Sequence, residues 1–215
     1  MRKIKMFMSF ILILMTGIVV AQGDVDNREK FQFGLKAGAN YSNVYNTQSE
    51  EFTANGKLGF AGGATFHIPL GRIFGIQPEI LFSQRGFKGK GSLLGNDYSF
   101  KRTSTFLDIP LQLAVKPSKN ITIVAGPQYS FLLKQKDKFE STLFSSEQEE
   151  VFDNDNIRRN ILGFVAGVDV NIKHFVVGAR AGLDFIRNNG DGSSDTPQYK
   201  NAWVQLTVGY LFYKN

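Results

Sequence analysis

The stretch AWVQLTVGYLF, residues 202–212, decides the fold of this chain. Apolar side chains stand at every second position of it: Ala202, Val204, Leu206, Val208, Tyr210 and Phe212. The residues between them are mostly polar or small. Because successive side chains of a β-strand point to opposite faces, this alternation predicts a strand with one apolar and one polar face. The stretch LDIPLQLAV, residues 107–115, shows the same pattern.

The same alternation recurs along the chain and predicts eight strands. They cover residues 31–45, 57–68, 74–87, 100–115, 121–133, 158–172, 175–187 and 200–213. Most contain nine or more alternating residues, the length that a tilted transmembrane strand needs. The sequence between the strands predicts three short connections, at 69–73, 117–120 and 173–174. It also predicts four long polar loops, at 46–56, 88–99, 134–157 and 188–199.

This alternation of short turns and long loops is typical of an outer-membrane barrel with both termini in the periplasm. A soluble barrel would turn the apolar faces inward, but an eight-stranded lumen is too narrow for so many large side chains. We therefore expect an all-β, eight-stranded antiparallel up-and-down transmembrane β-barrel. One group of aromatic side chains would form its periplasmic girdle: Phe31, Phe74, Phe175, Tyr210, Phe212 and Tyr213.

The N-terminus predicts export. Arg2, Lys3 and Lys5 precede an apolar run from Met6 to Val20, and small residues stand before Gln22. This is the pattern of a secretory signal peptide, and the run is shorter than the roughly 20 residues of a membrane-spanning helix. We expect residues 1–21 to be a cleaved signal peptide, 22–30 a short periplasmic segment and 31–215 the barrel domain.

Composition excludes several kinds of protein. Without residues 1–21, the lysines and arginines fall from 25 to 22 against 19 acids, so the net charge falls from +6 to +3. Lysines and acids alternate in the loops, which argues against nucleic acid as a partner. The chain has no cysteine, which excludes disulfides and thiolate metal sites.

The chain resembles the PorT-like outer-membrane β-barrel family of Gram-negative bacteria. The matching stretches are GLKAGANYSN (34–43), GIQPEILFSQRGFK (75–88), FLDIPLQLAVKP (106–117), AGPQYSFLL (125–133), GFVAGVDV (163–170) and VVGARAGLDFI (176–186). The resemblance implies an eight-stranded barrel in the outer membrane and no settled activity, although one branch serves in protein secretion and gliding.

The C-terminus partly resembles the signal that the barrel-insertion machinery reads. Thr207, Gly209 and Phe212 match its polar, glycine and aromatic positions, whereas Lys214 replaces its final hydrophobic residue. We still expect this machinery to be a partner during biogenesis, and outer-membrane lipid to surround the barrel.

Charged residues on the polar face are the candidate site. Four of them lie at similar depth from the periplasmic end: Lys36, Glu79, Asp169 and Arg180. Unpaired charge in a narrow lumen is costly, so we expect these residues to compensate one another. A second tier nearer the loops comprises Arg85, Asp108, Arg159 and Asp184. We interpret these charges as an ion-pair plug; the alternatives are a path for protons or ions and catalysis by Glu79 or Asp108.

No enzyme signature is present, so we predict a non-enzymatic protein without a cofactor or metal. His67 and His174 are the only histidines. Neither has an acidic partner by spacing, so both are expected to be solvated near the membrane interface.

The loops are where a specific role would reside. Residues 134–157 carry seven acids: Asp137, Glu140, Glu147, Glu149, Glu150, Asp153 and Asp155. Asp153–Asn156 and Asn188–Asp195 are rich in oxygen ligands but match no complete calcium loop. Phe144, Val151 and Phe152 are unusual in a solvated loop, and we expect them to pack on the rim or to dock a partner.

Together these features predict an outer-membrane barrel with a filled lumen and a structural, adhesive or envelope-complex role, secretion included. The alternative is a narrow channel or a barrel that binds a small ligand in its lumen.

Overall fold

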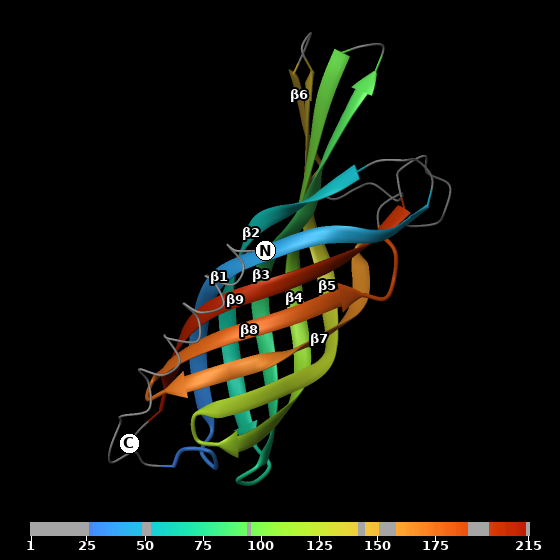
Figure 1. The fold of residues 1–215 in the computed structure, drawn as a ribbon. Coiled ribbons are helices and arrows are strands. Elements are labelled where there is room, and N and C mark those ends of the chain that lie inside the picture. The colour runs from blue at the N-terminus through green and yellow to red at the C-terminus, as the bar shows by residue number, and fades with distance from the viewer. Residues whose placement is uncertain are drawn as a thin grey trace, which may run out of the picture.

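The computed structural model describes residues 26–48, 53–93, 96–141, 145–150, 158–188 and 198–213. Within these ranges the chain forms nine β-strands (Figure 1). They are β1 (Gln32–Gln48), β2 (Thr53–Pro69), β3 (Phe74–Leu93), β4 (Asn96–Ser118), β5 (Ile121–Ser141), β6 (Ser145–Glu150), β7 (Asn160–Ile172), β8 (Phe175–Asp184) and β9 (Gln198–Phe212). No helix among the described residues is long and apolar enough to cross a membrane.

All described strands except β6 form one closed antiparallel ring. Each pairs with its neighbour along the chain, β5 pairs with β7, and β1 closes the ring on β9. The closing register runs from Phe33 opposite Phe212 to Tyr45 opposite Lys200. Closure satisfies the backbone hydrogen bonds that lipid cannot satisfy. The predicted eight-stranded up-and-down barrel is confirmed.

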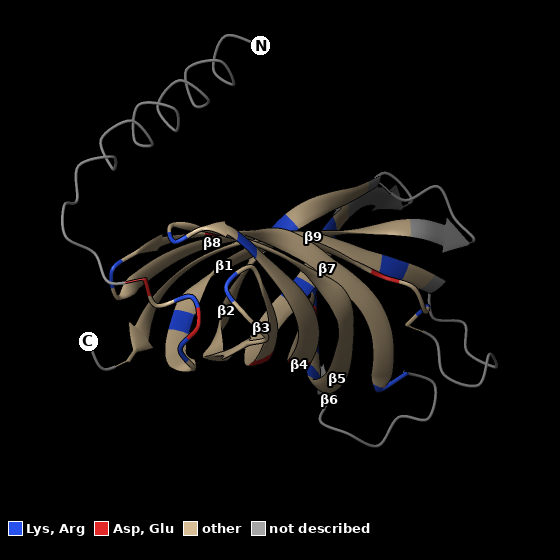
Figure 2. Ribbon diagram, turned by 90° about the horizontal axis from the view of Figure 1, so that it is seen from below, with Lys and Arg blue, Asp and Glu red and all other residues tan. Residues whose placement is uncertain are grey.

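The apolar faces point outward, as predicted. Leu58 is 71% exposed and Leu206 is 63% exposed, whereas Asn40, Arg85 and Asp184 on the opposite faces are fully buried. Charged positions form short bands on otherwise uncharged strands (Figure 2). A small buried apolar cluster of Phe106, Leu132 and Ile161 joins β4, β5 and β7. The rest of the interior is mostly polar, and the apolar belt faces outward, where lipid would lie.

The turn end of the barrel carries the predicted aromatic girdle. Its exposed members are Phe31, Phe74, Phe175, Tyr210 and Phe212. The Phe175 and Tyr210 rings meet edge to face with centroids 5.4 Å apart. Tyr213, the sixth, stacks on His174 at 4.3 Å. The short connections between β2 and β3, β4 and β5, and β7 and β8 lie at this end.

Two predicted loops are largely strands, which corrects the prediction for 88–99 and 134–157. β3 and β4 pair as far as Leu93 opposite Asn96, and β5 continues to Ser141 and pairs with β6. The connection from β1 to β2 is also shorter than predicted, since β1 ends at Gln48 and β2 begins at Thr53. These extensions lack an apolar face, because beyond the membrane neither face meets lipid. Period-two alternation is therefore absent there, although the backbone still pairs.

The extensions of β3, β4 and β5, together with β6, form a projecting sheet at the loop end of the barrel (Figure 1). Arg102 anchors it at the rim. Its guanidinium donates to both carboxylate oxygens of Asp137, at 2.8 and 2.6 Å, and lies 3.4 Å from the Tyr199 hydroxyl. The Tyr199 ring packs edge-on against Phe87, with centroids 5.2 Å apart.

Candidate functional site

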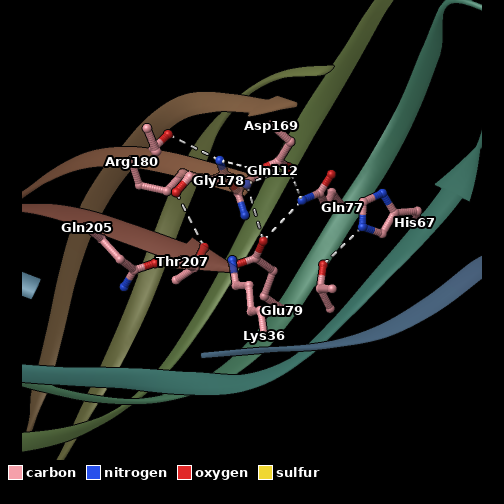
Figure 3. Close-up of polar contacts among 12 residues, drawn as sticks. Lys36, His67, Gln77, Glu79, Gln112, Asp169, Gly178, Arg180, Gln205 and Thr207 are labelled. Atoms are coloured by element: carbon pink, nitrogen blue, oxygen red, sulfur yellow. Dashed lines mark hydrogen bonds and ion pairs between the residues drawn. The ribbon is translucent and has the colours of Figure 1, made fainter. Parts of the chain in front are cut away.

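Four of the predicted lumen charges meet in one cluster near the turn end (Figure 3). Lys36 Nζ lies 2.5 Å from Glu79 Oε2. Arg180 donates to both carboxylate oxygens of Asp169, at 2.7 and 2.8 Å. Arg180 Nη2 also lies 3.5 Å from Glu79 Oε1, and this contact joins the two ion pairs. We call this set of Lys36, Glu79, Asp169 and Arg180 the turn-side cluster.

Two glutamines bind the turn-side cluster across the lumen. Gln77 Nε2 donates to Glu79 at 3.1 Å and to Asp169 at 3.0 Å. Gln112 accepts a hydrogen bond from Arg180 Nε at 3.1 Å. Strands β1, β3, β4, β7 and β8 all contribute side chains, and all six residues are at most 9% exposed. Two positive and two negative charges cancel, which a buried group of charges requires.

A glycine makes room for the cluster. Gly178 lies directly opposite Asp169 in the β7–β8 register. A Cβ atom at Gly178 would lie 2.7 Å from Asp169 Oδ1 and 2.9 Å from Thr207 Oγ1. Any larger side chain would therefore displace the carboxylate that holds Arg180.

Three residues of the predicted second tier meet nearer the loops. Arg85 lies 2.6 Å from Asp108 and 3.3 Å from Asp184. Ser83 donates to Asp108 at 2.5 Å, and Asn201 donates to Asp184 at 2.6 Å. We call Arg85, Asp108 and Asp184 the loop-side cluster.

Arg159, the fourth residue of that tier, lies just before β7 and is half-buried. Its backbone carbonyl accepts a hydrogen bond from the Leu132 N–H at 2.7 Å. That contact places it at the start of β7, beside the loop end of β5.

Aromatic rings complete the loop-side cluster, a role that was not predicted from the sequence. The guanidinium carbon of Arg85 lies 3.7 Å from the centroid of the Trp203 ring and 4.8 Å from that of Phe106. Such contacts stabilise a buried cation through the ring quadrupole. The alternation in β9 could have predicted that Trp203 points into the lumen, because Trp203 lies on the same inward face as Gln205 and Thr207.

The prediction for His67 is wrong. His67 is 4% exposed, points into the lumen and lies 3.3 Å from the Thr65 hydroxyl. His67 lies two residues after Thr65 in β2, so both side chains point to the inner face of the barrel. His67 therefore lies in the lumen although it is near the end of the strand. His174 is half-buried in the β7–β8 turn, where its Nδ1 lies 2.9 Å from the Leu211 carbonyl oxygen.

Little space is left beside the turn-side cluster. The cavity there, between Lys36, His67 and Asp169, measures about 10 Å³. One water molecule needs roughly 10–15 Å³ by this measure, so the cavity holds one at most. In the part of the chain that the structure describes, no group of three His, Asp or Glu side chains could hold a metal ion.

The described residues include some of the residues singled out in the predicted loops. Asp153–Asn156 and the hydrophobic residues Phe144, Val151 and Phe152 lie outside the described residues. Asp137 is bound to Arg102. Asn188 uses its side-chain oxygen to accept the Tyr199 N–H at 2.8 Å.

A closed antiparallel barrel with an apolar outer face and a lumen of paired charges defines a transmembrane β-barrel. The chain matches the family described as outer membrane protein beta-barrel domain over residues 20–185, and it belongs to that family.

Solved outer-membrane barrels have a similar fold. Ail of Yersinia pestis, solved in complex with the heparin analogue sucrose octasulfate, is 17% identical and has a TM-score of 0.46, with coverage of 85% of this chain and 99% of Ail. Neisserial surface protein A is 11% identical and has a TM-score of 0.48, with coverage of 84% of this chain and 97% of that protein. OprG of Pseudomonas aeruginosa is 15% identical and has a TM-score of 0.45, with coverage of 89% of this chain and 100% of OprG. A search of curated proteins found no match.

Proposed function

We propose that this protein is a non-enzymatic, non-conducting outer-membrane barrel that carries a docking surface on the loop side. The observation that carries the proposal is the filled lumen. The turn-side and loop-side clusters bind side chains from opposite walls, and the cavity beside the turn-side cluster holds one water at most. Ion conduction needs a continuous wet path, which such a plug interrupts.

The docking part of the proposal rests on the projecting sheet. Its strands extend beyond the barrel and are held there by Arg102 and Tyr199. An ordered sheet outside the membrane is a surface on which an adhesion target or an envelope protein can bind. A role in secretion, like that of one PorT-like branch, is the finer form of this proposal.

Export and insertion belong to the same proposal. A signal peptide cleaved before Gln22 would deliver the chain to the periplasm, and the barrel-insertion machinery would place it in outer-membrane lipid. N-terminal sequencing of the protein from isolated outer membranes tests the cleavage, with Gln22 expected as the first residue.

Conductance in planar lipid bilayers tests the plug. We expect no current steps from the native barrel. The double variant Arg85→Ser, Arg180→Ser, which removes the large side chain of each cluster, should conduct and shows that the assay detects an open lumen. Current steps from the native protein would overturn the proposal and favour the narrow channel.

Site-specific cross-linking in intact cells tests docking. A photo-reactive amino acid at Lys101, exposed on the projecting sheet, should capture a macromolecular partner, whereas one at exposed Lys119 in the β4–β5 turn provides the turn-end control. The docking role fails if Lys101 gives no product beyond that of Lys119.

A further inference from the structure

The turn end of the barrel holds a second polar cavity, which shares His67 with the cavity beside the turn-side cluster, while none of the described residues that line it belongs to either cluster. It measures about 50 Å³, room for a few water molecules at roughly 10–15 Å³ each, or for one small oxyanion. Its cationic lining residues come from four parts of the chain: Arg28 before β1, Lys116 at the end of β4, Lys119 in the β4–β5 turn and Lys173 in the β7–β8 turn.

The described residues that line this cavity carry an excess of positive charge. No acidic residue is among the described residues that line it. The acids nearest to Arg28 are Asp26, which binds Arg28 at 2.7 Å and Arg72 at 3.3 Å, and Glu29. Among the described residues, Arg28, Lys116 and Lys173 outnumber these two acids even when Lys119 is not counted.

Lys116 makes the imbalance costly, because it is only 5% exposed. Its ammonium donates a hydrogen bond to the Arg28 carbonyl at 3.0 Å, and the repulsion by the Arg28 guanidinium exceeds the attraction by Asp26. Buried cations are normally paired with an anion or a metal-bound group. A carbonyl oxygen satisfies one of the three donors of Lys116 and neutralises none of its charge.

The cavity also presents unused acceptors. Among the described residues, Asn27 Oδ1 and Asn171 Oδ1 are buried without a hydrogen-bond partner, and both residues line the cavity. The Asn171 side chain is held by its bond to Thr122 at 3.0 Å. A ligand that fits must therefore accept hydrogen bonds from cations and also donate to amide oxygens.

We propose that this cavity binds inorganic phosphate on the periplasmic side of the membrane. Phosphate accepts from Lys116, Lys173 and Arg28, and its protonated oxygen donates to Asn27 and Asn171. Sulfate, phosphodiester headgroups and the dianion of a phosphate monoester carry no such hydrogen at neutral pH. The site thus distinguishes inorganic phosphate from sulfate, from phosphate monoesters and from the phosphodiester of a membrane lipid.

Calorimetric titration of the detergent-solubilised mature barrel in phosphate-free buffer tests the site. Inorganic phosphate should bind saturably with one ligand per barrel. Sulfate, glycerol 3-phosphate and dihexanoyl phosphatidylglycerol should bind at least tenfold more weakly. Equal binding of all four probes, or binding of none, would overturn the proposal.

Variants locate the binding in the cavity. Lys173→Asn removes one cation, and asparagine tolerates the positive φ of 53° at this turn position. It should weaken phosphate binding about tenfold, as loss of a charge-assisted hydrogen bond does. Lys116→Gln should have at least that effect. Lys88→Gln at the loop end is the matched control and should bind like the native protein. Equal affinity of Lys173→Asn and the control would refute the site.

Discussion

Gly182 and Trp203 face each other directly in the β8–β9 register, and the Trp203 ring lies over the glycine. A Cβ atom at Gly182 would lie 2.3 Å from the ring. The absence of a side chain therefore lets the only tryptophan of the chain lie flat under Arg85. One glycine thus sets the geometry of the loop-side cluster.

Gly182→Ala should push the Trp203 ring away from Arg85. We expect a loss of about 1–3 kcal/mol in the free energy of unfolding, the usual cost of overpacking. Trp203 fluorescence should also change its emission maximum. Ala181→Val, which adds its methyl groups on the lipid face of the same strand, is the control. Identical spectra and stabilities for the two variants would contradict the role of Gly182.

Arg180→Met should destabilise the barrel by about 3–5 kcal/mol, because Glu79 and Asp169 lose the cation between them. Denaturant titration in lipid vesicles measures the loss. The double variant Arg180→Met, Asp169→Asn should recover part of it by removing the stranded charge. A double variant less stable than the single one would show that the turn-side cluster is not coupled as described.

The lipid face predicts a position-dependent cost for charge. Leu206→Arg, in the middle of β9, should reduce the free energy of unfolding by about 2–4 kcal/mol. Leu70→Arg, equally exposed but in the β2–β3 turn, should cost about 0–1 kcal/mol. Equal losses in vesicles would mean that the apolar belt does not face hydrocarbon.

The segment before β1 should respond to acid. The Arg28 side chain bonds Asp26 and holds the pKa of that carboxyl well below its usual range. A lowered pKa contributes stability above the unfolded value of about 3.9 and loses it as pH falls through the folded value. The Arg28 Nε–H resonance should therefore shift only well below pH 4. A titration near 3.9, or the same shift in Asp26→Asn, would disprove the pairing.

Arg102→Ala should loosen the projecting sheet without opening the barrel. The substitution removes two bonds to Asp137 and the contact with Tyr199. Hydrogen exchange should rise in residues 134–141 and stay unchanged in 121–130. Lys101→Ala, on the outer face of the same strand, is the control.

The barrel itself followed from the sequence because lipid imposes one rule on every strand. Residues such as Leu206 and Thr207 alternate wherever one face meets hydrocarbon, so the eight strands of the ring, their directions and the lumen charges could be predicted. Lys36 and Glu79 lie at similar numbers of residues from the turn end of their strands, which predicted a similar depth in the lumen. The two side chains are in contact.

The other features of the structure depend on contacts that the alternation of apolar and polar residues does not predict. Residues 88–93 and 134–141 pair as strands in water, where no face need be apolar. The stacking of Arg85 on Trp203 depends on strand stagger, which moves side chains along the barrel axis. The cavity at Lys116 depends on how the segment before β1 folds back, and its contacts are formed by side chains far apart in the sequence.

The pairing of β1 with β9 leaves no strand of the ring with an unpaired flank inside the membrane, where each such group would cost several kcal/mol. Among the described strands, the strand order ends on β6, which pairs with β5 alone. The backbone of this protein therefore keeps its spare hydrogen-bonding capacity in water. Within the hydrocarbon layer the described strands can associate with a neighbour only through side chains, whereas beyond it the outer edge of β6 has no strand partner among the described residues.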